Sequence, residues 1–200
     1  MDIVLTGVQH AEEFALNPAG AGGSSRDCSA ARVESLFRAH YARIAGMLAR
    51  LTGDRGQAEE IAADVFQKLA ERPALLEGGD DLTAWMYRVA TNAGFDALRA
   101  NARRRKREEA AGALGIGSLN NSPDHALDEM LRQERRARVR AVLGAMKPRE
   151  AQLLLLRSSG LAYREVAQAL GIHPGSVGTL LARAEAEFER RFRARYGDDV

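Results

Sequence analysis

The sequence predicts an all-α protein made of two small helical domains joined by an acidic flexible linker, the C-terminal domain being a helix-turn-helix. Apolar residues recur at spacings of three, four and seven, the period of one helix face, and strand-like alternation is absent. The segment GALGIGSLNNSPD has the Gly, Asn, Ser and Pro content of a linker. The segment LGIHPGSVGTLLARA places a glycine turn between two helical patterns. These three observations together define the fold class.

Composition fits this class and narrows the setting of the protein. The 200 residues are 46% hydrophobic and 28% charged, which is enough apolar material for a buried core. Cys28 is the single cysteine, so a disulfide within the chain is excluded and a reducing cytoplasm is expected. The first residues lack the basic region and apolar run of a signal peptide, and no stretch approaches about 18 consecutive apolar residues. We therefore expect a cytoplasmic protein without membrane insertion.

The first helical domain is expected at residues 29–107, after a disordered arm at residues 1–28. Its first helix is stopped at Gly53, and Asp54 caps the start of the next one. Asp81 caps a third helix, which runs into the basic segment RRRKR. The domain is therefore predicted to consist of three helices.

The charge pattern marks the boundary between the two domains. Six basic residues and no acid lie from Arg99 to Arg107, whereas six acids and one base lie from Glu108 to Glu134. The net charge of the whole chain is only +2, so it is this distribution that points to nucleic acid. We place the acidic linker at residues 108–130.

The second domain is expected at residues 131–197 as a helix-turn-helix. Pro148 stands at the first position of a helix that contains four consecutive leucines. A short helix from Tyr163 to Leu170 and a tight turn at Gly171 follow, and a long helix begins at Pro174. Short helices joined by a glycine turn are typical of DNA-binding domains of this type.

The sequence offers no catalytic or metal-binding constellation. The four histidines are isolated, with no second ligand at metal spacing. A phosphate-binding loop is absent, and the glycines of GALGIGS do not follow a strand. We therefore expect a protein that is not an enzyme and that needs no cofactor, metal or small-molecule substrate.

Three segments resemble one known family. AWMYRVATNAGFDALRANARRR resembles the promoter-binding helix of the extracytoplasmic-function (ECF) sigma factors of bacterial RNA polymerase, which belong to the sigma-70 family. LTGDRGQAEEIAADVF resembles the preceding segment of that family, which grips the clamp helices of the polymerase. LGAMKPREAQLLLLRSSGLAYREVAQALGIHPGSVGTLLARA resembles its C-terminal domain, which reads the upstream promoter element. The segments occur in the family's order, with an acidic linker between them.

The resemblance implies a role for particular residues. On it, the first domain binds core polymerase and the −10 element, and the second binds the −35 element. The residues that correspond to −10 contacts are Trp85, Arg88, Asn92, Asp96, Arg99 and Arg103. The residues that correspond to −35 contacts are His173, Ser176, Thr179 and Arg183. The residues that correspond to polymerase contacts are Glu60, Asp64 and Phe66. The implied partners are the polymerase clamp helices and flap, promoter DNA and an anti-sigma factor.

The sequence departs from the family pattern at several positions. Ala63-Asp64 replaces a pair that usually begins with Gln in the clamp-binding helix, and Ala162 replaces a capping Ser. In the recognition helix, Gly178 and Leu180 stand where the family commonly has Lys or Arg. We therefore expect the −35 interaction to be weaker in direct base readout and to depend more on DNA backbone shape and on polymerase.

Two other classes of protein compete with a sigma factor. One is an interaction protein that keeps the sigma-like shape but binds a regulatory partner and barely touches promoter DNA. Gly178 and Leu180 favour it, whereas the intact WMYRVATN segment and the RRRKR run oppose it. The other is an ordinary helix-turn-helix repressor or activator. A repressor of this type binds duplex DNA alone as a dimer, and it would leave the first domain without a role.

Overall fold

The computed structural model describes residues 21–77, 81–110 and 123–197. These residues form seven α-helices and two short 3-10 helices, and no strand occurs among them. None of the helices in the described ranges combines the length and apolar character needed to cross a membrane. The prediction of an all-α protein is confirmed.

The N-terminal half is a three-helix bundle. Its elements are α1 (Ala21–Thr52), α2 (Arg55–Ala70), η1 (Pro73–Glu77) and α3 (Asp81–Ala110). Gly53, at φ +76°, ends α1, and the carboxylate of Asp54 accepts a hydrogen bond of 3.0 Å from the backbone N–H of Gln57. These are the stop and the cap that the sequence predicts. The turn brings α2 back along α1, and both helices pack against α3 around fully buried residues such as Leu48 and Tyr87.

The C-terminal half contains the helix-turn-helix. Its elements are α4 (Pro123–Ala145), α5 (Pro148–Ser158), α6 (Tyr163–Leu170), η2 (Pro174–Ser176) and α7 (Val177–Tyr196). Gly171 ends α6 in the left-handed conformation, at φ +61°, which gives the chain the sharp turn between α6 and α7. The buried residues Leu156, Val166 and Val177 join α5, α6 and α7 into one core. Pro148 begins α5, as predicted.

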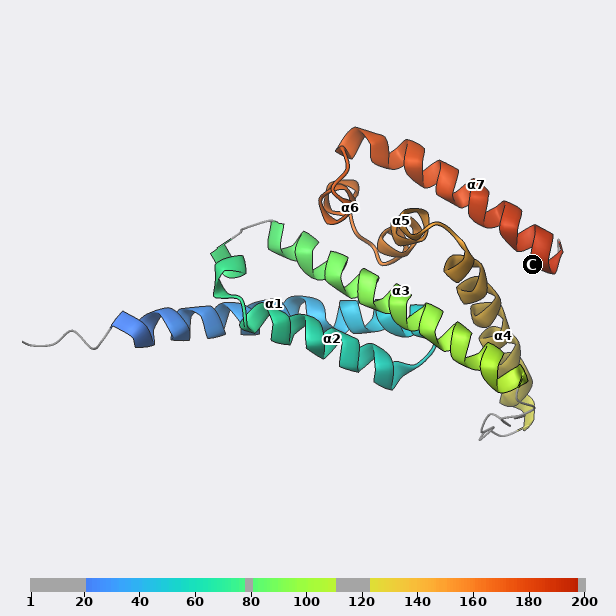
Figure 1. The fold of residues 1–200 in the computed structure, drawn as a ribbon, viewed down its shortest axis with the longest axis horizontal. Helices are drawn as coiled ribbons and strands as arrows, with labels where there is room; N and C mark the ends of the chain where they lie inside the picture. The colour runs from blue at the N-terminus through green and yellow to red at the C-terminus, as the bar shows by residue number, and fades with distance from the viewer. Residues whose placement is uncertain (1–20, 78–80, 111–122, 198–200) are drawn as a thin grey trace, which may run out of the picture.

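The two halves pack directly against each other. Helices α5 and α6 pack against α3, and α4 runs beside the C-terminal end of α3 (Figure 1). The guanidinium of Arg43 in α1 donates to the carbonyl oxygen of Ser159 at 3.0 Å, and Arg50 donates to the Ser159 hydroxyl at 3.3 Å. The buried apolar residues of the two halves also form one continuous core.

The predicted segment boundaries need correction in three places. Helix α1 begins at Ala21, inside the predicted arm, although Gly22 and Gly23 are poor helix formers; no proline interrupts the segment from there to Val33. Helix α3 continues to Ala110, since RRRKREEA consists of strong helix formers. Helix α4 begins at Pro123, a residue suited to the first helical turn, and so takes in part of the predicted linker. Residues 1–20 of the arm and 111–122 of the linker lie outside the described residues.

Candidate nucleic-acid interface

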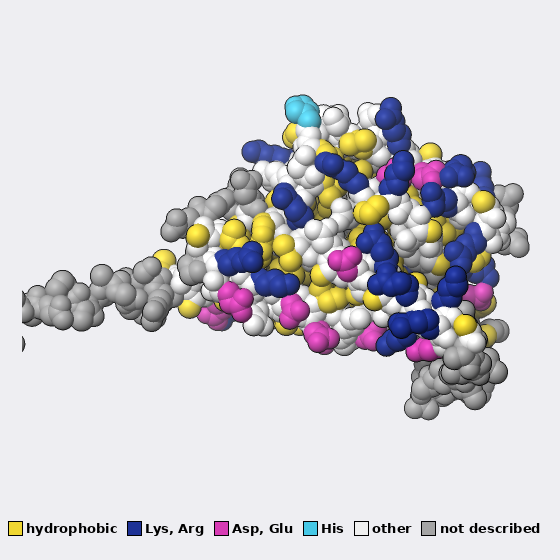
Figure 2. All heavy atoms as spheres, viewed as in Figure 1, with side chains coloured by type: hydrophobic (Ala, Val, Ile, Leu, Met, Phe, Trp, Pro, Cys, Tyr) yellow, Lys and Arg dark blue, Asp and Glu magenta, His cyan; other side chains and the backbone are white. Residues whose placement is uncertain are grey.

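The surface charge is divided between two parts of the molecule. Figure 2 shows Lys and Arg gathered over the right-hand side of the molecule, around the C-terminal half of α3, and Asp and Glu along the lower edge, near α2. The five basic residues from Arg103 to Arg107 are all exposed. Among the described residues, Arg104 forms the one ion pair of this run with an acid, at 3.8 Å to Glu108. The end of α3 therefore offers a concentrated positive surface to a polyanion.

The predicted −10 residues lie along one face of α3. Trp85, Arg88, Asn92, Asp96, Arg99 and Arg103 are separated by three or four residues each, the spacing that places helical side chains above one another. Arg88, Asn92, Asp96 and Arg103 are exposed, and Arg99 and Trp85 are half-buried. Trp85 also packs against the apolar core. The structure thus brings these six residues together on a single stripe.

The first part of this stripe is in contact with the C-terminal half. Arg88 donates through Nε to the carbonyl oxygen of Ala169 at 2.7 Å and through Nη2 to that of Gln168 at 2.9 Å. The amide of Gln152 donates to Oδ1 of Asn92 at 2.5 Å. In this closed arrangement, with α5 and α6 packed against α3, Nε and Nη2 of Arg88 and Oδ1 of Asn92 have protein partners.

The predicted −35 residues lie at the start of α7 and in the turn before it. His173, Ser176, Thr179 and Arg183 are all exposed. Nδ1 of His173 accepts a hydrogen bond of 3.2 Å from the backbone N–H of Gly175, so the ring caps η2. Ser176, Thr179 and Arg183 are spaced by three and four and share one face of the helix.

Leu180 and Gly178, the two departures in the recognition helix, have different surroundings. Leu180 is half-buried and packs against the core of the domain. A Cβ atom added at Gly178 would lie 3.7 Å from Cε2 of Tyr163, which is an ordinary contact distance. The helix therefore has room for a Cβ atom at position 178. Ala162 has no side-chain cap, but the carboxylate of Glu165 still accepts from its backbone N–H at 2.6 Å.

The predicted polymerase-binding residues do not share one environment. Glu60 and Asp64 are exposed and lie one turn apart on α2. Phe66 is only 5% exposed, and its ring contacts Phe37, with the centroids 5.0 Å apart. It therefore belongs to the core, whereas Phe37 is 41% exposed. Nothing in the sequence distinguishes the exposed Phe37 from the buried Phe66, since both are apolar residues in helical segments.

An apolar groove of about 390 Å³ on the C-terminal half was missed by sequence reasoning. It lies between α4, α5 and α7, and its apolar lining residues are Val139, Leu143, Leu154, Leu155, Leu181 and Phe188. Val139 at its edge is 38% exposed. Of the four consecutive leucines in α5, Leu153, Leu155 and Leu156 are buried and Leu154 is half-buried. Leu155 and Leu181 are buried, and the other four apolar lining residues are at least partly exposed.

A basic helix on a helical bundle, joined to a helix-turn-helix, defines a DNA-binding protein of the all-helical class. Residues 36–104 match the family described as Sigma-70 region 2, and residues 136–188 match Sigma-70, region 4. The chain therefore belongs to the sigma-70 family of RNA polymerase sigma factors, and to its extracytoplasmic-function group.

Three relatives illustrate this similarity. The RNA polymerase sigma factor YlaC of Bacillus subtilis is 26% identical over 159 residues, which cover 79% of this chain and 90% of YlaC. The ECF RNA polymerase sigma factor SigK of Mycolicibacterium vanbaalenii is 26% identical over 74% of this chain and 77% of its own length. The probable ECF RNA polymerase sigma factor SigI of Mycobacterium tuberculosis is 27% identical over 76% of this chain, which spans about half (52%) of that relative.

Proposed function

We propose that the protein binds core RNA polymerase, directs it to a specific set of promoters and helps to open the −10 element. The single observation that carries this proposal is the stripe on α3, where Trp85, Asn92 and Arg103 stand on one helix face. An amide reads exposed base edges, an aromatic ring stacks on unpaired bases, and arginines bind phosphates. Such a mixture suits a strand that is being separated from its complement.

The start of α7 would make only weak direct contacts with the bases of the −35 element. Ser176, Thr179 and Arg183 supply one short exposed face, and Leu180 is turned partly into the domain. Among these residues only Arg183 can make a bidentate contact to guanine, so phosphate contacts would make up most of the binding. Binding at this element would therefore depend on DNA shape and on the polymerase that holds the domain in place.

Two surfaces would hold the polymerase. Glu60 and Asp64 form an exposed acidic site on α2, suited to the clamp helices. The apolar groove between α4, α5 and α7 suits the flap, because it exposes aliphatic and aromatic side chains that a partner would cover. An anti-sigma factor is a further proposed partner, since it would have to cover surfaces of this kind to keep polymerase away.

The closed arrangement would have to open before a promoter is bound. The −35 and −10 elements are named for positions about 25 base pairs apart, which is about 85 Å of B-form DNA. A compact chain of 200 residues has a radius of gyration of only about 16 Å. The contacts of α5 and α6 with α3 therefore oppose simultaneous binding of both elements. We propose that the closed arrangement is the resting state.

Run-off transcription tests this function directly. The full chain is added to core polymerase that lacks a sigma factor, together with a library of promoter fragments, and the transcripts are sequenced. We expect transcripts that start downstream of a shared pair of −35 and −10 elements. If the chain does not bind polymerase at all, the proposed function is wrong.

A second candidate function is a sigma-like protein that binds a regulatory partner and does not open promoters. The absence of Lys and Arg from Val177 to Ala182 favours it. In the same assay, this protein would bind polymerase but give no transcripts from any fragment. Restoring a basic side chain at position 178, where the helix has room, would then distinguish a weak sigma factor from a protein with no promoter role.

A further inference from the structure

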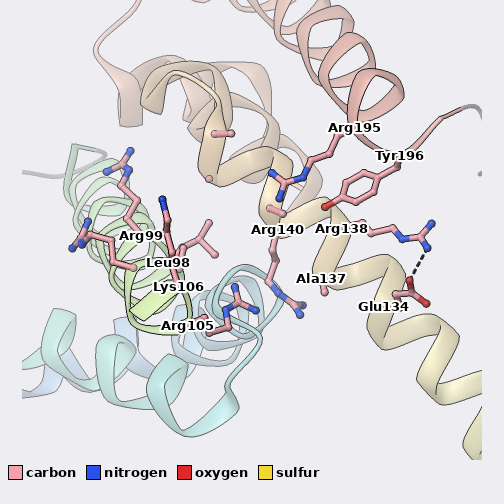
Figure 3. A pocket seen from close by; sticks show the side chains of 15 residues that line it. Leu98, Arg99, Arg105, Lys106, Glu134, Ala137, Arg138, Arg140, Arg195 and Tyr196 are labelled. Carbon is pink, nitrogen blue, oxygen red and sulfur yellow. Dashed lines mark hydrogen bonds and ion pairs between the residues drawn. The ribbon is translucent and has the colours of Figure 1, made fainter. Parts of the chain in front are cut away.

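An open basic cleft lies where the two halves of the chain meet. It has a volume of about 880 Å³ and is bounded by the C-terminal part of α3, by α4 and by the end of α7. Figure 3 shows Arg99, Arg105 and Lys106 on α3, Arg140 on α4 and Arg195 on α7 around this space. The cleft therefore exists only while the two halves are in contact.

The charges around the cleft are strongly unbalanced. Glu134 is the only acid among its lining residues, and it already forms an ion pair of 2.6 Å with Arg138. Arg99 forms a longer pair of 3.3 Å with Asp96, which is outside the lining. The other basic residues of the lining are Arg103, Arg105, Lys106, Arg140 and Arg195, and the charge of Arg105 acts on Arg140. Like charges confined in this way favour the binding of a multivalent anion.

Arg140 is the most constrained of these residues. A Cβ atom added at Gly53 would lie 2.8 Å from Cζ of Arg140, so the guanidinium packs against the turn between α1 and α2. Partial burial, together with the charges of Arg105 and Arg136, lowers the pKa of Arg140. Its position is therefore fixed by packing and is electrostatically unfavourable in the absence of an anion.

We propose that this cleft binds a short phosphate chain, carried by an inorganic polyphosphate or by a nucleoside polyphosphate. Guanidinium groups bind phosphate oxygens in pairs, and the cleft presents them from three helices. Its volume is in the range of small-ligand pockets and is far too small for a DNA duplex. The bound anion neutralises charges on both halves at once and so fastens α4 and α7 to α3.

The anion would compete with promoter DNA, a consequence that rests on the proposed function. Arg99 and Arg103 line the cleft and are also proposed to contact phosphates at the −10 element. Occupation of the cleft would therefore keep the chain in its closed arrangement. The binding itself is independent of polymerase and DNA, so it can be tested without either.

Isothermal titration of the full chain with sodium tripolyphosphate tests the proposal. We expect saturable binding of one anion per chain at constant ionic strength, with little heat from sulfate. The double variant Lys106→Ala, Arg195→Ala should bind at least tenfold more weakly. Both side chains are exposed, so their removal leaves the core intact. The matched control Arg38→Ala, Arg55→Ala removes the same charge from exposed positions away from the cleft and should bind like the unmodified chain.

Further arms of the titration distinguish the sources of the phosphate chain. Equal affinity for ATP and tripolyphosphate would show that the chain of phosphates is recognised, and tighter binding of ATP would point to a nucleoside polyphosphate. Either result supports the proposal if the double variant no longer binds the anion. Equal weakening in the control variant would overturn it. So would a single-stranded oligonucleotide that binds more tightly and displaces tripolyphosphate, because the cleft would then be part of the nucleic-acid surface.

Small-angle X-ray scattering supplies the readout for closure. Tripolyphosphate should keep the radius of gyration of the chain constant as the salt concentration rises, whereas the double variant should expand with or without the anion. An unchanged radius in every condition would contradict the role of the anion in fastening the two halves. Neither result depends on whether the chain supports transcription.

Discussion

Helices α3 and α7 each present a face that we propose to contact promoter DNA, but they differ in what they offer. Helix α3 carries six basic residues from Arg99 to Arg107, next to an amide and an aromatic ring. Helix α7 carries no Lys or Arg from its start to Ala182 and has small polar groups in their place. The contrast indicates that most of the binding free energy for DNA would come from α3, with α7 contributing position more than affinity.

The strongest test of this contrast removes the amide of Asn92. Asn92→Ala should reduce promoter opening roughly tenfold or more, because one base-edge hydrogen-bonding group is worth about 1–3 kcal/mol. Permanganate reactivity of unpaired thymines measures the opening, and co-purification measures polymerase binding. Gln152→Ala is the control, since it removes the protein partner of Asn92 and leaves the amide in place. Loss of polymerase binding in Asn92→Ala would show that the residue is wrongly assigned.

The second test compares phosphate contacts on the two helices. Arg103→Ala on α3 and Arg183→Ala on α7 should each weaken promoter binding by the holoenzyme about fivefold at low salt. Each should also reduce the slope of log affinity against log salt concentration by about one. Titrations at four salt concentrations provide the measurement. A variant with unchanged affinity at every salt concentration would place its arginine outside the interface.

The third test adds a basic side chain to the start of α7, which has no Lys or Arg before Arg183. Gly178→Arg should raise affinity for the −35 element about threefold, since a Cβ atom fits there at 3.7 Å from Tyr163. Gly178→Ala is the matched control, because it stabilises the helix by about 0.5–1 kcal/mol without adding a charge. Equal gains in the two variants would mean that helix stability, and not contact with DNA, limits binding. The measurement is competition between promoters with intact and altered −35 elements.

The fourth test uses pH and should give the smallest effect. His40 lies between the two halves with Tyr87, Arg164 and Glu165, and its pKa is lowered by burial and by the nearby Arg43. The folded chain favours the neutral ring of His40. The contribution of this ring to stability is therefore full above the unfolded pKa of about 6.5 and is lost as the pH falls below it. The free energy of unfolding, measured with urea, should therefore fall between pH 8 and pH 5.5, and it should fall less in His40→Gln. An identical fall in both proteins would exclude His40 as its source.

The elements of this fold were largely predictable because their signals are local. Asp54, Pro148 and Gly171 each mark a helix end through their own backbone or side-chain chemistry, and each lies at the predicted place. The contacts between the halves were not predictable in the same way. Arg88 and Ala169 are 81 residues apart, and periodicity carries no information about a partner at that separation.

The candidate site shows the same division between local and distant information. The stripe on α3 follows directly from spacings of three and four along one helix. The burial of Phe66 does not, because both a core face and a partner-binding face are apolar in sequence. The basic cleft was also out of reach, since its arginines come from three helices that only the folded chain brings together.

The two hydrogen bonds of Arg88 to the carbonyl oxygens of Gln168 and Ala169 have a thermodynamic consequence. These carbonyls are at the C-terminal end of α6, where the helix dipole attracts a positive charge. The Nε–H and an Nη2–H of Arg88, the pair that would bind a phosphate side by side, are both used at this helix end. If Arg88 contacts the promoter as proposed, opening of the chain and promoter binding are reciprocally linked: DNA bound to Arg88 would weaken closure by the same factor by which closure weakens the affinity for DNA.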